Sequence, residues 1–229
     1  MTAVALAALM LPMNAMQPDP YSGARARMVE TQIASRGVRD ERVLAAMRAV
    51  PRHRFVDPSL AAEAYNDHPL PIGHGQTISQ PYIVAYMVEQ LRVAPDDRVL
   101  EVGTGCGYQA AVLGELAREV YTIEIVEPLA RCAEKTLAEL GYQNVHVRHG
   151  DGYHGWPEHA PFDGIVVAAA PEQVPPALVE QLAPGGRLVI PVGRLEQEIR
   201  VITRSADGLV QERLIPVRFV PLVRDPGGR

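Results

Sequence analysis

The sequence has few cysteines, no run of basic residues and no long apolar run, and each absence excludes a class of protein. Its two cysteines, Cys106 and Cys132, do not have the spacing of a metal site, so no metal is expected. Two thiols without a disulfide framework are typical of a reducing compartment. The net charge is −5, and no cluster of Lys or Arg indicates binding to nucleic acid. No apolar stretch is long enough to cross a membrane.

What the sequence does contain is typical of an ordinary globular protein. Hydrophobic residues make up 47% and charged residues 21% of the 229 residues, a length that fits one domain with small appendages. The chain has neither an internal repeat nor a low-complexity segment. A monomer is expected.

Residues 1–20 form an N-terminal extension with more than one interpretation. Ala3 to Met13 is almost wholly apolar, and the prolines at 18 and 20 end any helix. As a secretory signal, this segment lacks a preceding Lys or Arg, and Met13-Asn-Ala15 is a poor cleavage site. The other interpretations are a docked or frayed helix, or a start codon placed too far upstream. We therefore expect a cytoplasmic protein, with export as the alternative if residues 1–15 act as a signal.

The chain from Ser22 to Leu91 is predicted to be helical with irregular connections. Its apolar residues recur at helical spacing, as at Met28, Ile33, Val43, Leu44 and Met47. Two prolines and two glycines between His68 and Gly75 predict that this segment has no regular structure. A helix is expected from Pro81 to Leu91, with Ser79 as its cap.

The next part of the chain alternates between strands and helices. Short apolar segments predict strands at Arg98 to Val102, Val120 to Ile125, Val145 to Arg148, Gly164 to Ala170 and Arg187 to Val192. Helices are expected at Tyr108 to Arg118, Pro128 to Leu140 and Pro176 to Leu182. This alternation predicts an α/β fold in which helices cover both faces of a doubly wound, mostly parallel sheet.

The last part of the chain, from Glu198 to Val223, is β-rich and is expected to add antiparallel strands at one edge of the sheet. We therefore predict one domain over residues 21–229. It consists of a helical region at 21–91, an α/β core at 92–193 and a β-rich part at 194–229.

The central motif is the glycine loop in Val99-Leu-Glu-Val-Gly-Thr-Gly-Cys-Gly-Tyr108, where a predicted strand leads through glycines into a helix. Glycine allows a sharp turn and a close approach of the ligand to the backbone. Ligands of open α/β sheets bind at this place. A dinucleotide-binding loop requires G-x-G-x-x-G, whose third glycine falls on Tyr108, with Gly107 one residue early. An NAD-dependent oxidoreductase is therefore disfavoured.

The spacing from Glu101 to Gly107 resembles the first motif of class I S-adenosylmethionine-dependent methyltransferases. The resemblance implies that the loop holds the methionine end of the cofactor and that Glu101 orients the loop or the cofactor amino group. It implies a ribose-binding role for Glu124, which ends the next strand and is otherwise a solvated strand end. Asp151 then meets the adenine amino group, with the Gly152 backbone nearby. The expected cofactor-binding residues are Thr77, Ile78, Glu101, Gly103, Thr104, Gly105, Gly107, Glu124, Asp151 and Gly152.

Other segments resemble the protein-L-isoaspartate O-methyltransferase family, and together they cover nearly all of the chain after about Arg27. They are Met47 to Val56, Tyr65 to Gly73, Gly75 to Ala85, Leu182 to Gly193 and Val217 to Leu222. The resemblance implies methyl transfer from S-adenosylmethionine to the α-carboxylate of L-isoaspartyl residues in damaged proteins or peptides, which begins repair through a succinimide. A different carboxyl or small-molecule acceptor is the alternative.

Family correspondence makes Ser79 the catalytic residue, whose hydroxyl would hydrogen-bond the substrate carboxylate and orient it. The alternative is that Ser79 only caps a helix. A carboxylate, with a pKa near 4, is already a nucleophile at neutral pH and needs no general base. A binding module that has lost methyl transfer is a third possibility, and intact Ser79 and Glu124 argue against it. Arg218 and Arg224 are candidates for attracting the anionic substrate, and the alternative is that both are exposed charges of an edge strand. Cys106 is interpreted as a small buried spacer.

Overall fold

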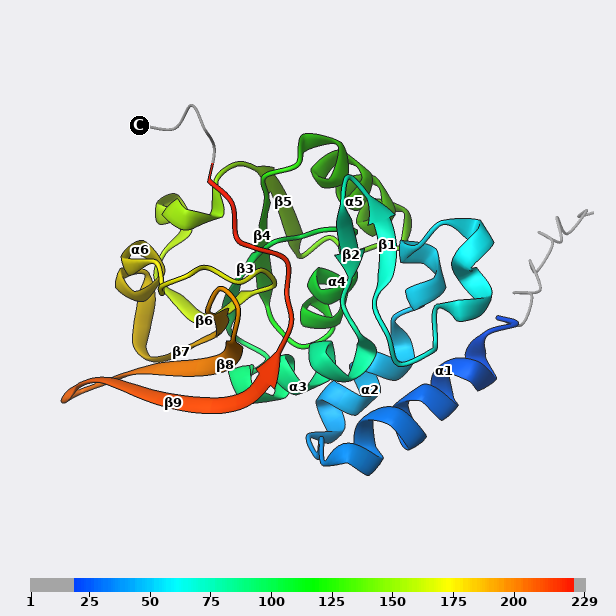
Figure 1. Ribbon diagram of the computed structural model, residues 1–229, viewed down its shortest axis with the longest axis horizontal. Coiled ribbons are helices and arrows are strands. Elements are labelled where there is room, and N and C mark those ends of the chain that lie inside the picture. Colours follow the sequence, from blue (N-terminus) through cyan, green and yellow to red (C-terminus); the bar gives the residue numbers. More distant parts are fainter. Residues whose placement is uncertain (1–18, 225–229) are drawn as a thin grey trace, which may run out of the picture.

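The computed structural model describes residues 19–224, so the apolar segment from Ala3 to Met13 lies outside the described residues. A seven-stranded sheet has the order β5-β4-β3-β6-β7-β8-β9 (Figure 1). The strands are β3 (Arg98–Val102), β4 (Glu119–Glu124), β5 (Val145–His149), β6 (Phe162–Val167), β7 (Leu182–Val192), β8 (Gln197–Ser205) and β9 (Gly208–Val217). The first five are parallel, and β8 and β9 add antiparallel strands at one edge. The predicted fold class is confirmed.

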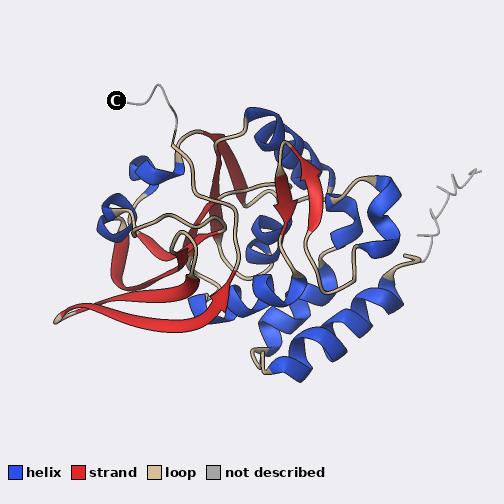
Figure 2. Ribbon diagram, in the orientation of Figure 1, coloured by secondary structure: helices blue, strands red, loops and turns tan. Residues whose placement is uncertain are grey.

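Helices pack on both faces of this sheet (Figure 2), because successive side chains of a strand point to opposite faces. In β3, Val99 belongs to one hydrophobic cluster, while Leu100 and Val102 belong to the other. The first cluster includes residues of α3 (Pro81–Leu91), α4 (Tyr108–Gly114) and α5 (Glu127–Glu139), and the second includes residues of α6 (Pro176–Glu180). None of the helices in residues 19–224 has the length and apolar character needed to cross a membrane.

The N-terminal region packs its helices against the first cluster. Helix α1 (Ser22–Met28) continues through a π-helical turn, Val29–Ile33, and a 3-10 turn, Ala34–Arg36. It ends at Gly37, whose φ of 101° is left-handed, as is common after a helix. The following elements are α2 (Glu41–Ala49) and two 3-10 helices at Arg52–Phe55 and Pro58–Glu63.

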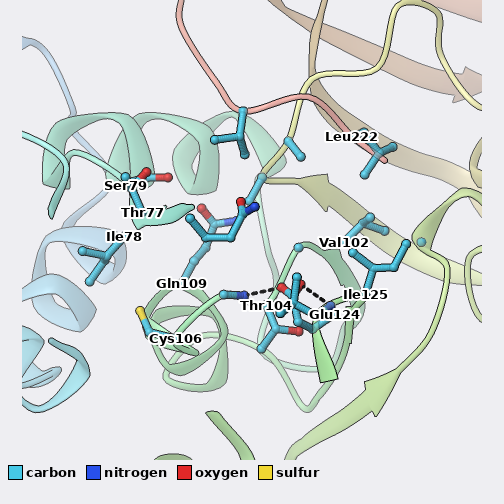
Figure 3. Close-up of a pocket in the computed structure, with 18 of the residues that line it drawn as sticks. Thr77, Ile78, Ser79, Val102, Thr104, Cys106, Gln109, Glu124, Ile125 and Leu222 are labelled. Carbon is cyan, nitrogen blue, oxygen red and sulfur yellow. Dashed lines mark hydrogen bonds between the residues drawn. The ribbon is translucent and has the colours of Figure 1, made fainter. Parts of the chain in front are cut away.

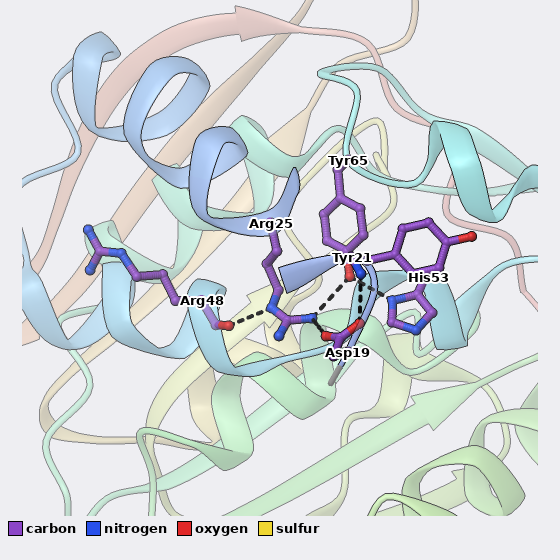
Figure 4. A network of polar contacts seen from close by, with 6 residues as sticks. All are labelled: Asp19, Tyr21, Arg25, Arg48, His53 and Tyr65. Atoms are coloured by element: carbon purple, nitrogen blue, oxygen red, sulfur yellow. Dashed lines mark hydrogen bonds and ion pairs between the residues drawn. The ribbon is translucent and has the colours of Figure 1, made fainter. Parts of the chain in front are cut away.

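A polar network ties the start of α1 to the elements that follow it (Figure 4). The Arg25 guanidinium pairs with Asp19 at 2.7 Å and donates to the Arg48 carbonyl at 2.6 Å and to the Tyr65 hydroxyl at 3.3 Å. His53 Nδ1 shares a hydrogen bond of 2.7 Å with the same hydroxyl. The network therefore holds α1 against the end of α2 and the segment that leads to the next strands.

The segment from His68 to Gly75 is not irregular, and this prediction was wrong. Strands β1 (Leu70–Gly73) and β2 (Gln76–Ile78) form an antiparallel hairpin. Its turn consists of His74 and Gly75, with φ of 52° and 71°, and two left-handed residues are what the tightest hairpin turns require. Pro71 is tolerated because a two-stranded ribbon leaves each strand one edge without ladder hydrogen bonds.

The predicted cap of α3 was also wrong. The N-cap residue is Gln80, not Ser79, and the Gln80 side chain makes no cap hydrogen bond. Asp67, from a distant segment, supplies the cap instead. The Asp67 Oδ1 accepts from the Tyr82 N–H at 3.2 Å, and the Asp67 Oδ2 accepts from Gln80 Nε2 at 2.7 Å. Ser79 therefore has no capping role.

Helix α4 ends at Gly114, four residues before its predicted end at Arg118. The Asn144 side chain donates to the carbonyls of Gly114 and Ala117 at 3.0 and 3.1 Å, and these bonds satisfy the end of the helix.

We predict that Asp67→Ala lowers the free energy of unfolding by about 2 kcal/mol, because a helix cap and an ion pair with Arg36 are lost together. Urea denaturation of the purified variant measures the effect. Asp96→Ala is the matched control, since Asp96 is exposed and lies in a turn. Equal stability of the two variants would contradict the role of Asp67.

Candidate active site

A cavity opens at the carboxyl ends of β3, β4 and β6, where the glycine loop connects β3 to α4 (Figure 3). Gly103, Gly105 and Gly107 have φ of 94°, 54° and 92°, so all three adopt the left-handed backbone that side chains disfavour. A Cβ at Gly107 would lie 3.2 Å from Leu137 Cδ1 and 3.3 Å from Ala133 Cβ. The loop therefore requires glycine for both its conformation and its packing against α5.

Glu124, at the end of β4, holds this loop in place. Its carboxylate is buried, with 6% of the residue exposed, so it is not a solvated strand end. Oε2 accepts from the Gly105 N–H at 2.7 Å, and Oε1 accepts from the Val126 N–H at 2.9 Å (Figure 3). Each oxygen keeps a second lone pair at the cavity wall, which suits a ligand with adjacent hydroxyl groups.

Glu101 lies behind the loop and is completely buried. The Thr122 hydroxyl donates to its Oε2, and the Thr122 and Thr104 hydroxyls are 2.6 Å apart. Burial, with a smaller contribution from the nearby Glu124, raises the pKa of Glu101 to about 8. Glu101 does not belong to the residues that line the cavity, so its contact with the cofactor stays a prediction.

Gly152 lines the cavity on the side of β5, and steric contact explains why a glycine is present. A Cβ at Gly152 would lie 2.2 Å from Val102 Cγ1, closer than any real contact. The neighbouring Asp151 accepts from the Tyr153 N–H at 2.8 Å and so caps the short 3-10 helix Gly152–His154. Asp151 is not a lining residue, and its contact with adenine stays a prediction.

The structure brings most of the predicted residues together around one cavity. Those that line it are Thr77, Ile78, Ser79, Gly103, Thr104, Gly105, Glu124 and Gly152, whereas Glu101, Gly107 and Asp151 lie behind its wall. Cys106 also lines it, and burial raises the pKa of its thiol to about 11. The thiol stays protonated near neutral pH, which agrees with a spacer and not with a nucleophile.

Sequence reasoning missed two parts of this cavity. One is Gln109, in the first turn of α4, whose side chain is buried and interacts with the Glu101 carboxyl group. The other is the segment from Val220 to Val223, which crosses the carboxyl ends of the strands (Figure 1, red). Ala170 anchors this segment, donating to the Val220 carbonyl at 2.8 Å and accepting from the Leu222 N–H at 2.9 Å. The family-like motif from Val217 to Leu222 was the sequence signal that could have indicated this segment.

A second cavity adjoins the first and shares Thr77, Ser79, Ala168 and Val220 with it. One wall carries Arg36 and Tyr82, and the other consists of Ile215 to Val220. Ser79, which is half-buried, therefore stands where the two cavities meet.

The two arginines left open by the sequence differ in position. Arg218 is exposed and lines the second cavity, whereas Arg224 stacks over the Tyr153 ring at 4.1 Å. Arg36 lines the same cavity but is already paired with Asp67 at 2.6 Å and lies 3.5 Å from the centre of the Tyr82 ring. Of the two arginines, only Arg218 lines one of these two cavities.

Comparisons with known proteins agree with this geometry. The family model described as protein-L-isoaspartate(D-aspartate) O-methyltransferase matches residues 24–226. A protein-L-isoaspartate O-methyltransferase of Gloeobacter violaceus is 60% identical over 86% of this chain and 98% of its own length. One of Opitutus terrae is 61% identical over 88% of this chain and 87% of its own length.

Two solved structures have the same fold at a TM-score of 0.78. One is a protein-L-isoaspartate O-methyltransferase with 29% identity, in which this chain spans 65% of that chain's length and 86% of its own. The other, from Plasmodium falciparum, is 27% identical, covers 88% of this chain and 99% of its own, and is in complex with S-adenosyl-L-homocysteine.

The raised pKa of Glu101 predicts a pH dependence of stability. Protonated Glu101 stabilises the fold fully below the ordinary pKa of 4.5, and this contribution is lost as the pH rises through about 8. Because glutamine carries no charge, Glu101→Gln should gain stability relative to the wild type over this pH range. Urea midpoints measured at several pH values test this. Glu134→Gln, at an exposed position, is the control. The prediction would be contradicted if the stability of both variants relative to the wild type did not change with pH.

Proposed function

The chain belongs to the protein-L-isoaspartate(D-aspartate) O-methyltransferase family, and we propose that it transfers a methyl group from S-adenosylmethionine to the α-carboxylate of L-isoaspartyl residues in damaged proteins. The ester that forms then closes to a succinimide, whose hydrolysis returns some normal aspartate. The observation that carries the proposal is the position of Ser79, on the shared wall of two adjoining cavities.

The first cavity fits S-adenosylmethionine by the chemistry of its walls. The left-handed glycines leave room beside the loop backbone, and Gln109 adds a polar side chain to the cavity wall. Glu124 would hold the ribose hydroxyls, Gly152 would lie against the adenine, and Thr77 and Ile78 would close the side next to the substrate. The bound cofactor supplies a methyl group that its sulfonium already activates.

Ser79 would act by positioning. Its hydroxyl donates a hydrogen bond to one oxygen of the substrate carboxylate, so the other oxygen faces the cofactor cavity. The carboxylate is ionised at neutral pH, so no side chain has to remove a proton. Catalysis then depends on orientation and on the exclusion of water, for which the Val220 to Val223 segment covers the cavity.

The second cavity would hold the substrate peptide. Its walls come from the segment around Ser79 and from residues 215–220, and its exposed cation, Arg218, would attract the carboxylate. Within one domain, residues 92–193 would then form most of the cofactor cavity, Thr77, Ile78 and the Val220 to Val223 segment would complete it, and the helical region at 21–91 would form a lid over the substrate.

We also propose that the protein works in the cytoplasm as a monomer, on proteins and peptides, without nucleic acid or membrane. Both of its cysteines are free thiols, and its net charge is −5. These observations favour a reducing compartment and disfavour a nucleic-acid partner.

A methylation assay tests the proposal. The protein is incubated with methyl-labelled S-adenosylmethionine and two peptides that differ only in an isoaspartyl or a normal aspartyl linkage. Label should enter the isoaspartyl peptide alone, as a base-labile ester. Equal labelling of both peptides, or of neither, would overturn the proposed substrate and leave a different acceptor as the explanation.

Replacement of Ser79 tests its role. We expect Ser79→Ala to lower kcat roughly ten- to a hundred-fold, because an orienting hydrogen bond is lost. The affinity for S-adenosyl-L-homocysteine, measured by calorimetry, should change much less. Ser35→Ala, at an exposed site on the N-terminal helix, is the control. Loss of cofactor affinity with unchanged kcat would make Ser79 a structural residue.

A further inference from the structure

Arg52 is a charged side chain in an apolar place. It begins the 3-10 helix Arg52–Phe55 and is 0% exposed. Its Nε donates to the Ala64 carbonyl at 2.7 Å, and its Nη2 donates to the Ser79 carbonyl at 2.8 Å. Its guanidinium lies 4.7 Å from the centre of the Tyr108 ring. None of its interactions within the described residues is with a carboxylate: the guanidinium interacts with the Tyr108 side chain, and Nη1 makes no hydrogen bond of good geometry.

This arrangement is unfavourable for stability. A buried charge is costly unless an opposite charge accompanies it, and burial lowers the pKa of the Arg52 guanidinium. Arginine nevertheless stays protonated in proteins. The two ionisable side chains that interact most strongly with its charge, Tyr108 and Cys106, have pKa values raised to about 12 and about 11, so neither neutralises it. An apolar side chain of similar volume would fill the same space without this cost.

The contacts of Arg52 join the two halves of the candidate active site. Ser79 and Tyr108 both line the first cavity, but Ser79 belongs to the segment before α3 and Tyr108 is the first residue after the glycine loop. Arg52 does not line the cavity itself and lies behind both. It therefore sets the position of the Ser79 backbone relative to the helix that follows the cofactor loop.

We propose that Arg52 is a positioning residue for methyl transfer: it fixes the Ser79 backbone by its hydrogen bond and supplies the buried positive charge that the substrate carboxylate balances. The inference rests on the proposed function, in which an anion binds at Ser79. Because Arg52 lines neither cavity, its charge would act on the bound carboxylate through the Ser79 peptide unit and not by direct contact. The bond to the Ser79 carbonyl also orients that peptide unit, and with it the side chain.

The test compares Arg52→Met, Arg52→Lys and the control Arg54→Met in the full-length protein. Arg54 belongs to the same 3-10 helix but has a half-exposed side chain and pairs with Glu139 at the surface. For each variant, kcat and KM for an isoaspartyl peptide are measured, together with the Kd for S-adenosyl-L-homocysteine and the Tm.

We expect Arg52→Met to stay folded, since a buried charge is replaced by an apolar chain of similar length. Its kcat/KM for the peptide should fall roughly ten- to a hundred-fold, while the Kd for S-adenosyl-L-homocysteine changes less than about three-fold. Arg52→Lys keeps the charge but cannot hold both carbonyls in the same way, so it should recover KM more than kcat. Arg54→Met should behave as the wild type.

Two results would overturn the inference. One is that the folded Arg52→Met variant has the same kcat/KM for the peptide as the wild type. If Arg52→Met does not fold, the same result in Arg52→Lys would overturn the inference. The other is an equal loss of affinity for peptide and for S-adenosyl-L-homocysteine, which would mean that Arg52 only supports the fold. Failure of the wild type to label the isoaspartyl peptide is a separate result, because it rejects the proposed function itself.

Discussion

The cofactor side of the candidate active site depends on the two hydrogen bonds that Glu124 accepts. The glycine loop follows β3 in a left-handed conformation, which leaves backbone N–H groups outside the strand ladder. The Glu124 carboxylate accepts a hydrogen bond from the Gly105 N–H of this loop and another from the Val126 N–H, which follows β4. One carboxylate therefore joins the connections that follow two neighbouring parallel strands. The strands bring these connections to the same edge of the sheet, but the carboxylate decides how the loop lies there. The cavity exists because the loop is held open in this way.

The substrate side has no comparable single residue and is built from distant parts of the chain. Ser79 follows the hairpin β1–β2, and the facing wall consists of residues 215–220. Strands β3 to β8 lie between these two segments in the sequence. The two cavities share a wall because the hairpin lies over the carboxyl ends of the strands, where the last segment also crosses.

The sequence predicts the central α/β core well because its signals are local. Strand β3, the glycine loop and Glu124 each follow from residues that are neighbours in the chain. The errors occur where distant residues decide the structure. Asp67 caps α3 across an interval of 15 residues, and the ladder between β1 and β2 outweighs the prolines of the hairpin. The contact between Arg52 and Ser79 spans 27 residues. Gln109 is next to the recognised motif, but only the folded chain shows that its side chain is buried beside Glu101 at the cavity wall.

The segment from Val220 to Val223 has a consequence for the newly made chain. It forms part of the cofactor cavity, yet it is synthesised after every strand of the sheet. Domains begin to fold while they leave the ribosome, from the N-terminal end. A chain that stops short of residue 220 therefore keeps every strand of the sheet and the glycine loop but lacks part of the wall of the cofactor cavity.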